Sequence, residues 1–330
     1  MINLNPFVDQ VRRTVDSHRL SEGCYCRWLW QDENSTRELG VNEYGCADAA
    51  NILYSIGDFP RDPSDRAHWV QALQSMQNPE TGLFTEKTHH TIHTTAHCVA
   101  ALELFDAQPL HSLRALEKYL DHDSMRAMLS ALNWDENPWP QSHQGAGLFA
   151  SLIITRMCDA AWQDAYFGYL MDNADPETGL GLTGRRGSAP LAHQLYGWFH
   201  YLFNHVHAHR TFPYPEKIID SCISLYQDRQ LSSVFSHEVG FMEIDWVFAM
   251  NRASRQTPHR FAEVKDLLWD MAQEFLPWLM SLDESSHDMF NDLHMLFGAV
   301  CAAAELQLAL PGMIRTDVPL KNVLDRRPFI

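Results

Sequence analysis

The sequence lacks long apolar runs and contains few basic residues. Its 330 residues include 25 Lys and Arg against 42 Asp and Glu, which gives a formal net charge of −17. No segment approaches the roughly 18 apolar residues of a membrane-spanning helix, and no Lys/Arg-rich run is present to neutralise nucleic-acid phosphates. We therefore expect no membrane insertion and no nucleic-acid partner, although a local arginine can still hold an anionic small molecule.

Signals of export and of oxidised cysteine are also missing. The N-terminal residues contain no apolar core of signal-peptide length. The seven cysteines are scattered, odd in number and mostly set in helical apolar patterns, which predicts reduced thiols. Cys24 and Cys26 are too close for a typical zinc knuckle and have no second pair to complete one. These features predict a cytoplasmic protein.

Alternating β-branched runs, which indicate strands, are scarce, whereas helical periodicity recurs from end to end. The sequence therefore predicts an all-α fold. Apolar helices rich in small residues alternate with amphipathic ones, after an irregular segment at 21–42. Apolar helices are expected near 43–57, 88–106, 142–157, 189–205, 238–253 and 288–308. Because helices that are apolar on most sides are buried, we expect six inner helices ringed by outer helices.

An internal repeat supports this layout. Asn78-Pro-Glu-Thr-Gly-Leu and Asp175-Pro-Glu-Thr-Gly-Leu are nearly identical, and each follows an amphipathic helix and precedes an apolar one. With a one-residue gap, His97 also aligns with His193. A helical hairpin cannot bury its inner face alone, so repeated hairpins stack until the core closes. The predicted fold is an (α/α)6 toroid that forms a single domain over residues 1–330.

The two turns, each followed by a buried helix, resemble the repeat of the six-hairpin superfamily. One branch of that superfamily is carbohydrate-active and contains unsaturated uronyl hydrolases, sugar epimerases and (α/α) polysaccharide lyases. The other branch contains terpenoid cyclases and protein prenyltransferases. The resemblance covers most of the chain as architecture, but its specific motif is the pair of turns. It therefore implies the fold more than the reaction.

The sequence departs from both branches at their functional motifs. The Asp-x-Asp-Asp acid motif of squalene-type cyclases does not occur. Asp220-Ser-Cys222 with His287 resembles the zinc-binding spacing of prenyltransferases, but the surrounding segment has the pattern of an outer helix. Uronyl hydrolases usually use aspartates at the mouth of the funnel, where Asp48 and Asp245 fit without a family signature.

In a toroid the first turns of the inner helices meet at one end, so polar residues far apart in sequence converge there. Four histidines occur within nine residues, between His89 and His97. Imidazole titrates near neutral pH and serves general acid–base chemistry. The candidate catalytic residues are His90, His93, His143, His193, Glu243 and Asp245. The candidate substrate-binding residues are Tyr44, Asp48, His89, Arg186, Trp139 and Trp246.

Each of these residues also has a structural interpretation, because buried histidines at helix starts often act as caps or hydrogen-bonded core residues. A metal site is a further alternative, in which an i,i+4 pair such as His89/His93 or His93/His97 binds zinc with Glu243 or Asp245 opposite. No His-Glu-x-x-His signature accompanies it. The later histidines His200, His205, His207 and His209 are expected at the surface.

These features predict an enzyme that acts on a small sugar or sugar acid, which can be anionic, by hydrolysis, lyase chemistry or epimerisation. No cofactor is expected, and a divalent metal such as zinc on the histidine cluster is the lesser alternative. Two other functions remain open. A terpenoid cyclase or prenyltransferase-like enzyme requires an aromatic cavity with a diphosphate site, and a non-catalytic binding toroid requires individually satisfied histidines without an open cavity.

Overall fold

The structure, a computed structural model, describes residues 1–184, 187–228, 231 and 239–330. These residues are mostly helical, which confirms the all-α prediction. The four strands present there contain two or three residues each and pair into two small sheets. They are β1 (Ile2–Asn3), β2 (Arg19–Ser21), β3 (Cys24–Tyr25) and β4 (Ile314–Arg315). None of the helices in the described part of the chain is long and apolar enough to cross a membrane.

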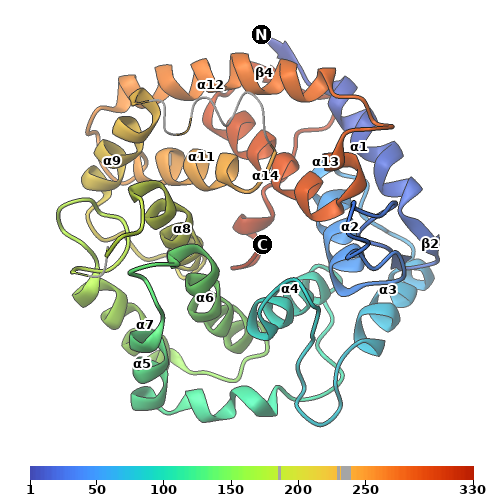
Figure 1. The fold of residues 1–330 in the computed structure, drawn as a ribbon, viewed down its shortest axis with the longest axis horizontal. Coiled ribbons are helices and arrows are strands. Elements are labelled where there is room, and N and C mark those ends of the chain that lie inside the picture. The colour runs from blue at the N-terminus through green and yellow to red at the C-terminus, as the bar shows by residue number, and fades with distance from the viewer. Residues whose placement is uncertain (185–186, 229–230, 232–238) are drawn as a thin grey trace.

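Six helices lie around the centre of the molecule, close to the predicted apolar segments (Figure 1). They are α2 (Glu43–Ile56), α4 (Thr91–Leu104), α6 (Pro138–Ile154), α8 (Leu191–His207), α11 (Met242–Ala253) and α14 (Leu293–Ala309). Each packs against the next in this order, and α14 packs against α2. Small side chains make this close packing feasible, since a methyl group on Gly147 of α6 would already contact Ala96 of α4.

A further set of helices lies outside these six (Figure 1). They are α1 (Asn5–Ser17), α3 (Pro63–Ser75), η1 (Arg114–Leu120), α5 (His122–Ala131), α7 (Ala160–Asn173), α9 (Pro215–Gln227) and α12 (Phe261–Ser281). Their apolar residues face inward, as on α1, where Phe7, Val11 and Val15 are buried and charged residues lie between them. This one-sided burial is the expected behaviour of an amphipathic helix.

The two repeated turns have the same conformation. In each, the glycine amide donates to the carbonyl of the first residue, from Gly82 to Asn78 and from Gly179 to Asp175. Both glycines have positive φ, +76° and +69°, a region that side-chain-bearing residues rarely adopt. The side-chain oxygen of Asn78 or Asp175 accepts a backbone N–H two residues later. The sequence repeat is therefore a repeat of structure.

The predicted helix at 288–308 is two helices, α13 (Asp288–Asn291) and α14, separated by Asp292. The Asp292 carboxylate accepts the backbone N–H of His294 and so caps α14. After α14, residues 310–330 contain the 3-10 helix η2 (Val323–Asp325) and return to the centre of the molecule (Figure 1). Phe329 and Ile330 are buried there.

Candidate functional site

A cavity of about 290 Å³ lies among the inner helices, beside their first turns. It is lined by Thr88, His89, His93, Trp139, Pro140, His143, Phe199, His200, Phe241, Asp245, His294 and Ile330. Five of these residues are histidines, and they come from α4, α6, α8, α14 and the residues just before α4. Histidines from distant parts of the sequence therefore converge, but they are not all the histidines that the sequence predicted.

Helix α4 carries His93 and His97 one turn apart on a single buried face, and His89 precedes them. Tyr44 of α2 stacks on His89 with ring centroids 4.4 Å apart. Its hydroxyl oxygen lies 2.5 Å from Nδ1 of His93. Burial lowers the pKa of His93, and neighbouring imidazoles such as His143 add to the effect. His93 is therefore a neutral imidazole whose Nδ1 is already engaged.

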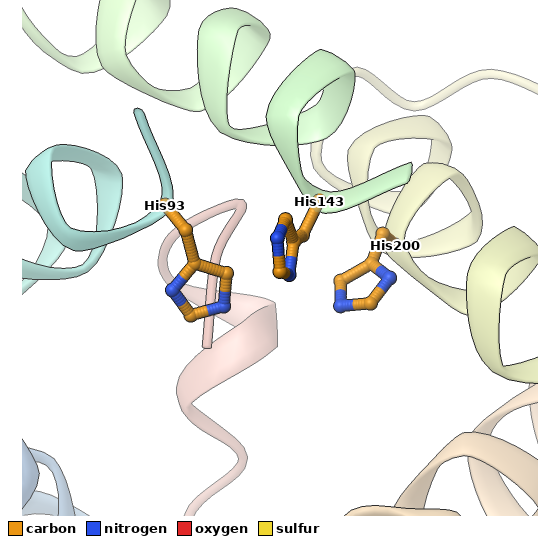
Figure 2. A group of neighbouring side chains, drawn as sticks. All are labelled: His93, His143 and His200. Atoms are coloured by element: carbon orange, nitrogen blue, oxygen red, sulfur yellow. The ribbon is translucent and has the colours of Figure 1, made fainter. Parts of the chain in front are cut away.

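His93, His143 and His200 form a cluster, here called the three-histidine cluster, with one side chain from each of α4, α6 and α8 (Figure 2). One nitrogen of each ring lies within 4.8 Å of the corresponding nitrogens of the other two. Nδ1 of His200 lies 3.1 Å from the Ser142 hydroxyl. Burial lowers the pKa of His200 to about 4 and lowers that of His143 as well.

A second group joins Asp48 of α2 to His97 of α4 and His294 of α14. Nε2 of His97 lies 2.8 Å from Oδ1 of Asp48, and Nδ1 of His294 lies 3.2 Å from both carboxylate oxygens. All three side chains are buried. Burial by itself raises the pKa of Asp48, but the two histidines more than offset it, so the pKa lies below its usual value. Asp48 is therefore a carboxylate that receives N–H groups from both rings.

Asp245 of α11 lines the cavity, and its side chain is 1% exposed. Neither carboxyl oxygen has a hydrogen-bond partner among the described residues. Burial raises the pKa of Asp245, and nearby Glu243 raises it further. Asp245 therefore holds its proton more strongly than an ordinary aspartic acid does. Glu243 is also buried, but it does not line the cavity, and it accepts the backbone N–H of Gly240.

Several predicted site residues lie away from the cavity. His90 is exposed and caps α4, with Nδ1 accepting the N–H of Ile92. His193 is exposed as well, so its alignment with the fully buried His97 does not extend to a shared environment. Trp246 belongs to the core, where its indole N–H donates to the Cys222 carbonyl. The prediction that these three residues line one cavity at the starts of the inner helices is therefore wrong.

The remaining predicted residues are accounted for as follows. His93, His143, His89, Trp139 and Asp245 line the cavity. Tyr44 and Asp48 lie directly behind cavity histidines, to which they bind. Arg186 lies outside the residues that the structure describes.

Sequence reasoning missed His200 and His294. His200 is 6% exposed rather than at the surface, and His205 is buried too. Helix α8 continues to His207, so His200 lies in the middle of a buried helix. His294 escapes the sequence pattern because that pattern predicts one helix from 288, whereas Asp292 begins a new first turn. An Asp two residues before a His, at the start of an apolar run, is the signal that was available.

The spacing that resembled a prenyltransferase zinc site corresponds to no cluster. Asp220 pairs with His259 and Arg260 on the outer side of α9, while Cys222 is fully buried in the core. His287 caps α13 by accepting the N–H of Met289. Among the described residues, these three do not come together as a group able to hold a metal ion.

No protein-family model matches this chain. No significant match occurs among curated proteins or among solved structures. The function must therefore be argued from the chemistry of the cavity itself.

Proposed function

We propose that the chain is an (α/α)6 toroid of the six-hairpin type and an enzyme that moves protons on a small sugar or sugar acid. The closed order of contacts from α2 to α14 and back to α2 supports the toroid, as do the two matching turns. The seven cysteines form no disulfide with one another, which supports the cytoplasm as the compartment. One observation carries the reaction: the imidazole of His294 and a buried carboxyl without a partner among the described residues, that of Asp245, line the same cavity.

The base in this proposal is His294. Asp48 carries no proton to donate, so the Nδ1–H of His294 must donate to it. The remaining lone pair is then on Nε2, and His294 lines the cavity. Burial lowers the pKa of His294 to about 4, against a partly compensating effect of Asp48. The ring is therefore neutral at pH 7, so Nε2 keeps the lone pair that a base requires, and Asp48 stabilises the imidazolium that forms on protonation.

The acid in this proposal is Asp245. A carboxyl that lacks a partner and is held protonated can donate its hydrogen to a substrate oxygen. With His294 removing the C–H proton next to a carbonyl group, Asp245 protonates that carbonyl oxygen, and an enol forms. Return of a proton to the opposite face gives an epimer. Loss of a leaving group one carbon further gives an unsaturated product.

Hydrolysis by paired carboxylates fits the cavity less well. Glycosidases place two carboxyl groups on either side of the scissile bond, whereas Asp245 is the only carboxylate among the described residues that line this cavity. A diphosphate substrate is disfavoured too, because no Lys or Arg occurs among those lining residues. The volume of about 290 Å³ is at the small end of ligand pockets, which favours a single sugar unit.

The test is hydrogen exchange in D2O, followed by NMR, with a panel of aldoses, uronic acids, unsaturated uronides and prenyl diphosphates. We expect loss of one substrate C–H signal with an aldose or uronic acid. Ultraviolet absorbance of a new conjugated double bond separates elimination from epimerisation. The rate should fall at least ~100-fold in His294→Gln, in Asp48→Asn and in Asp245→Asn, since general acid–base groups contribute on that scale.

His122→Gln is the control, because His122 begins the outer helix α5 and does not line the cavity. It should retain the wild-type rate. Exchange that persists undiminished in both His294→Gln and Asp48→Asn contradicts the proposal. Turnover of a glycoside or a prenyl diphosphate without exchange contradicts it as well.

A further inference from the structure

We propose that the three-histidine cluster of His93, His143 and His200 binds one divalent transition-metal ion, with an open coordination position that faces the cavity. This inference is independent of the proposed reaction, because ion binding is measured without a substrate. It differs from a site on a single helix, since the ligands come from α4, α6 and α8. Three imidazoles with a free position are the protein ligands of one kind of catalytic zinc site.

The tautomer of His200 follows from its neighbours. The Ser142 hydroxyl donates its hydrogen to the Trp139 carbonyl, 2.9 Å away. Its oxygen can therefore only accept from Nδ1 of His200, which lies 3.1 Å away. The Gly197 carbonyl, at 3.4 Å from the same nitrogen, is also an acceptor only. Nδ1 thus carries the hydrogen, and Nε2 holds the lone pair that a metal requires.

On the other side of the cluster, His93 also has a hydroxyl partner for one of its ring nitrogens. Its Nδ1 lies at hydrogen-bond distance from the Tyr44 hydroxyl, so Nε2 is the nitrogen left for a ligand. Metal-binding histidines almost always donate their second N–H to a fixed oxygen, which orients the ring. Tyr44 and Ser142 are such oxygens for His93 and His200.

His143 lies between the other two and contacts His93 edge to face, with centroids 4.5 Å apart. It makes no hydrogen bond to any described residue, and no hydrogen bond links the three rings to one another. Its ring nitrogens are therefore not engaged by another described side chain. An ion between the three rings would take one nitrogen from each of them.

The distances allow coordination after small adjustments. Zinc lies about 2.0–2.1 Å from each imidazole nitrogen, so three ligand nitrogens end roughly 3.3 Å apart. The nitrogens here lie within 4.8 Å of one another. Small rotations of the rings, which move each nitrogen by about an ångström, bring them to the coordination distance. Asp245, which is buried and has no hydrogen-bond partner among the described residues, lines the same cavity as the cluster.

The group formed by Asp48, His97 and His294 is the competing site, since its ligand atoms also lie within 4.8 Å of one another. Those atoms are already joined to each other by hydrogen bonds between 2.8 and 3.2 Å. A metal there would have to replace these bonds and displace two protons from ring nitrogens. The three-histidine cluster loses no such bonds.

The experiment is a titration of chelator-treated full-length protein with Co2+, followed by visible absorption, and then displacement by Zn2+. We expect saturation at one ion per chain, with the d–d bands of Co2+ bound to nitrogen ligands. His143→Gln and His200→Gln should each weaken binding more than ~100-fold. Ser142→Ala should weaken it about tenfold, within the range for residues that orient a ligand.

His207→Gln is the matched control, because His207 is on α8 two turns beyond His200 and does not line the cavity. It should bind Co2+ as the wild type does. Circular dichroism checks the fold of each variant, and Ser142→Ala together with His143→Gln decides the question if His200→Gln fails to fold. The proposal is overturned by wild-type protein that does not saturate. It is also overturned by binding that survives both His143→Gln and Ser142→Ala, or by binding that is lost only in Asp48→Asn.

Discussion

The buried ion pair between Arg27 and Asp292 positions a residue of the candidate site, His294. Its guanidinium and carboxylate meet through two contacts, of 2.8 and 3.0 Å, and both side chains are less than a tenth exposed. Asp292 also caps α14 directly before His294. Arg27 in turn binds the Thr88 hydroxyl and lies over the Tyr44 ring. The pair therefore fixes where α14 begins, and with it the direction of His294.

Asp292→Asn should destabilise the fold by about 3 kcal/mol. Asparagine keeps the size and the helix-capping oxygen, so the change isolates the charge, and loss of one partner of a buried pair leaves the other charge uncompensated. Urea unfolding followed by circular dichroism measures the effect. Asp106→Asn is the control, because Asp106 pairs with Arg66 and Arg326 while 75% exposed. It should cost less than ~1 kcal/mol, and equal losses in the two variants would refute the argument.

For individual residues, the sequence indicated which side chains belong to the site better than it indicated which residues they contact. His93, His143 and Asp245 could be chosen because polar residues in an apolar helix are conspicuous. His200 could not be assigned to the site, because its position there depends on contact with Ser142 of a different helix. The pairing of His294 with Asp48 joins residues 246 positions apart, and no local pattern carries such a contact.

The helices and the turns between them were the most predictable elements. Each of the six apolar segments overlaps an inner helix, since burial on all sides leaves a strong compositional pattern. The predicted helix boundaries were less accurate, because a single capping side chain determines where a helix begins. Asp292 divides α13 from α14, and His90 makes α4 begin at Thr91. Such caps contribute roughly 1 kcal/mol each, too little to dominate a sequence pattern.

The glycine of the first repeated turn provides a test at the scale of the element. At φ +76°, a Cβ on Gly82 would lie 1.9 Å from the backbone oxygen of Ser112. Gly82→Ala should therefore cost several kcal/mol, because a backbone segment must move in addition to the left-handed strain. Gly312 has φ +80° but open space around its Cβ position, so Gly312→Ala should cost only about 1–2 kcal/mol.

Denaturant unfolding of both variants measures the difference, which isolates the close approach of the turn to residues 112–113. If Gly82→Ala loses no more stability than Gly312→Ala, the turn does not depend on that contact. The repeated Pro-Glu-Thr-Gly-Leu sequence would then reflect the backbone conformation alone.

Across the whole molecule, buried neutral histidines make stability depend on pH. His205 and His18 are both buried and lie outside the cavity. Burial lowers the pKa of His205 to about 4, and Arg210 lowers it further against the opposing hydrogen bond to Tyr201. Burial also lowers the pKa of His18. Both values lie below that of an unfolded histidine, about 6.5, so each folded side chain resists protonation.

As the pH falls below about 6.5, the unfolded chain binds protons that the folded chain does not, and the free energy of unfolding decreases. His205 alone should remove about 1.6 kcal/mol between pH 6.5 and pH 5, because the unfolded side chain is half protonated at pH 6.5 and the slope approaches 1.36 kcal/mol per pH unit only below it. Urea unfolding at a series of pH values measures this slope. His205→Gln keeps a donor for the Tyr201 carbonyl but cannot titrate, so its slope should be shallower by that amount. A slope unchanged by this substitution would mean that His205 takes up a proton in the folded protein, and that its surroundings are open enough to hydrate it.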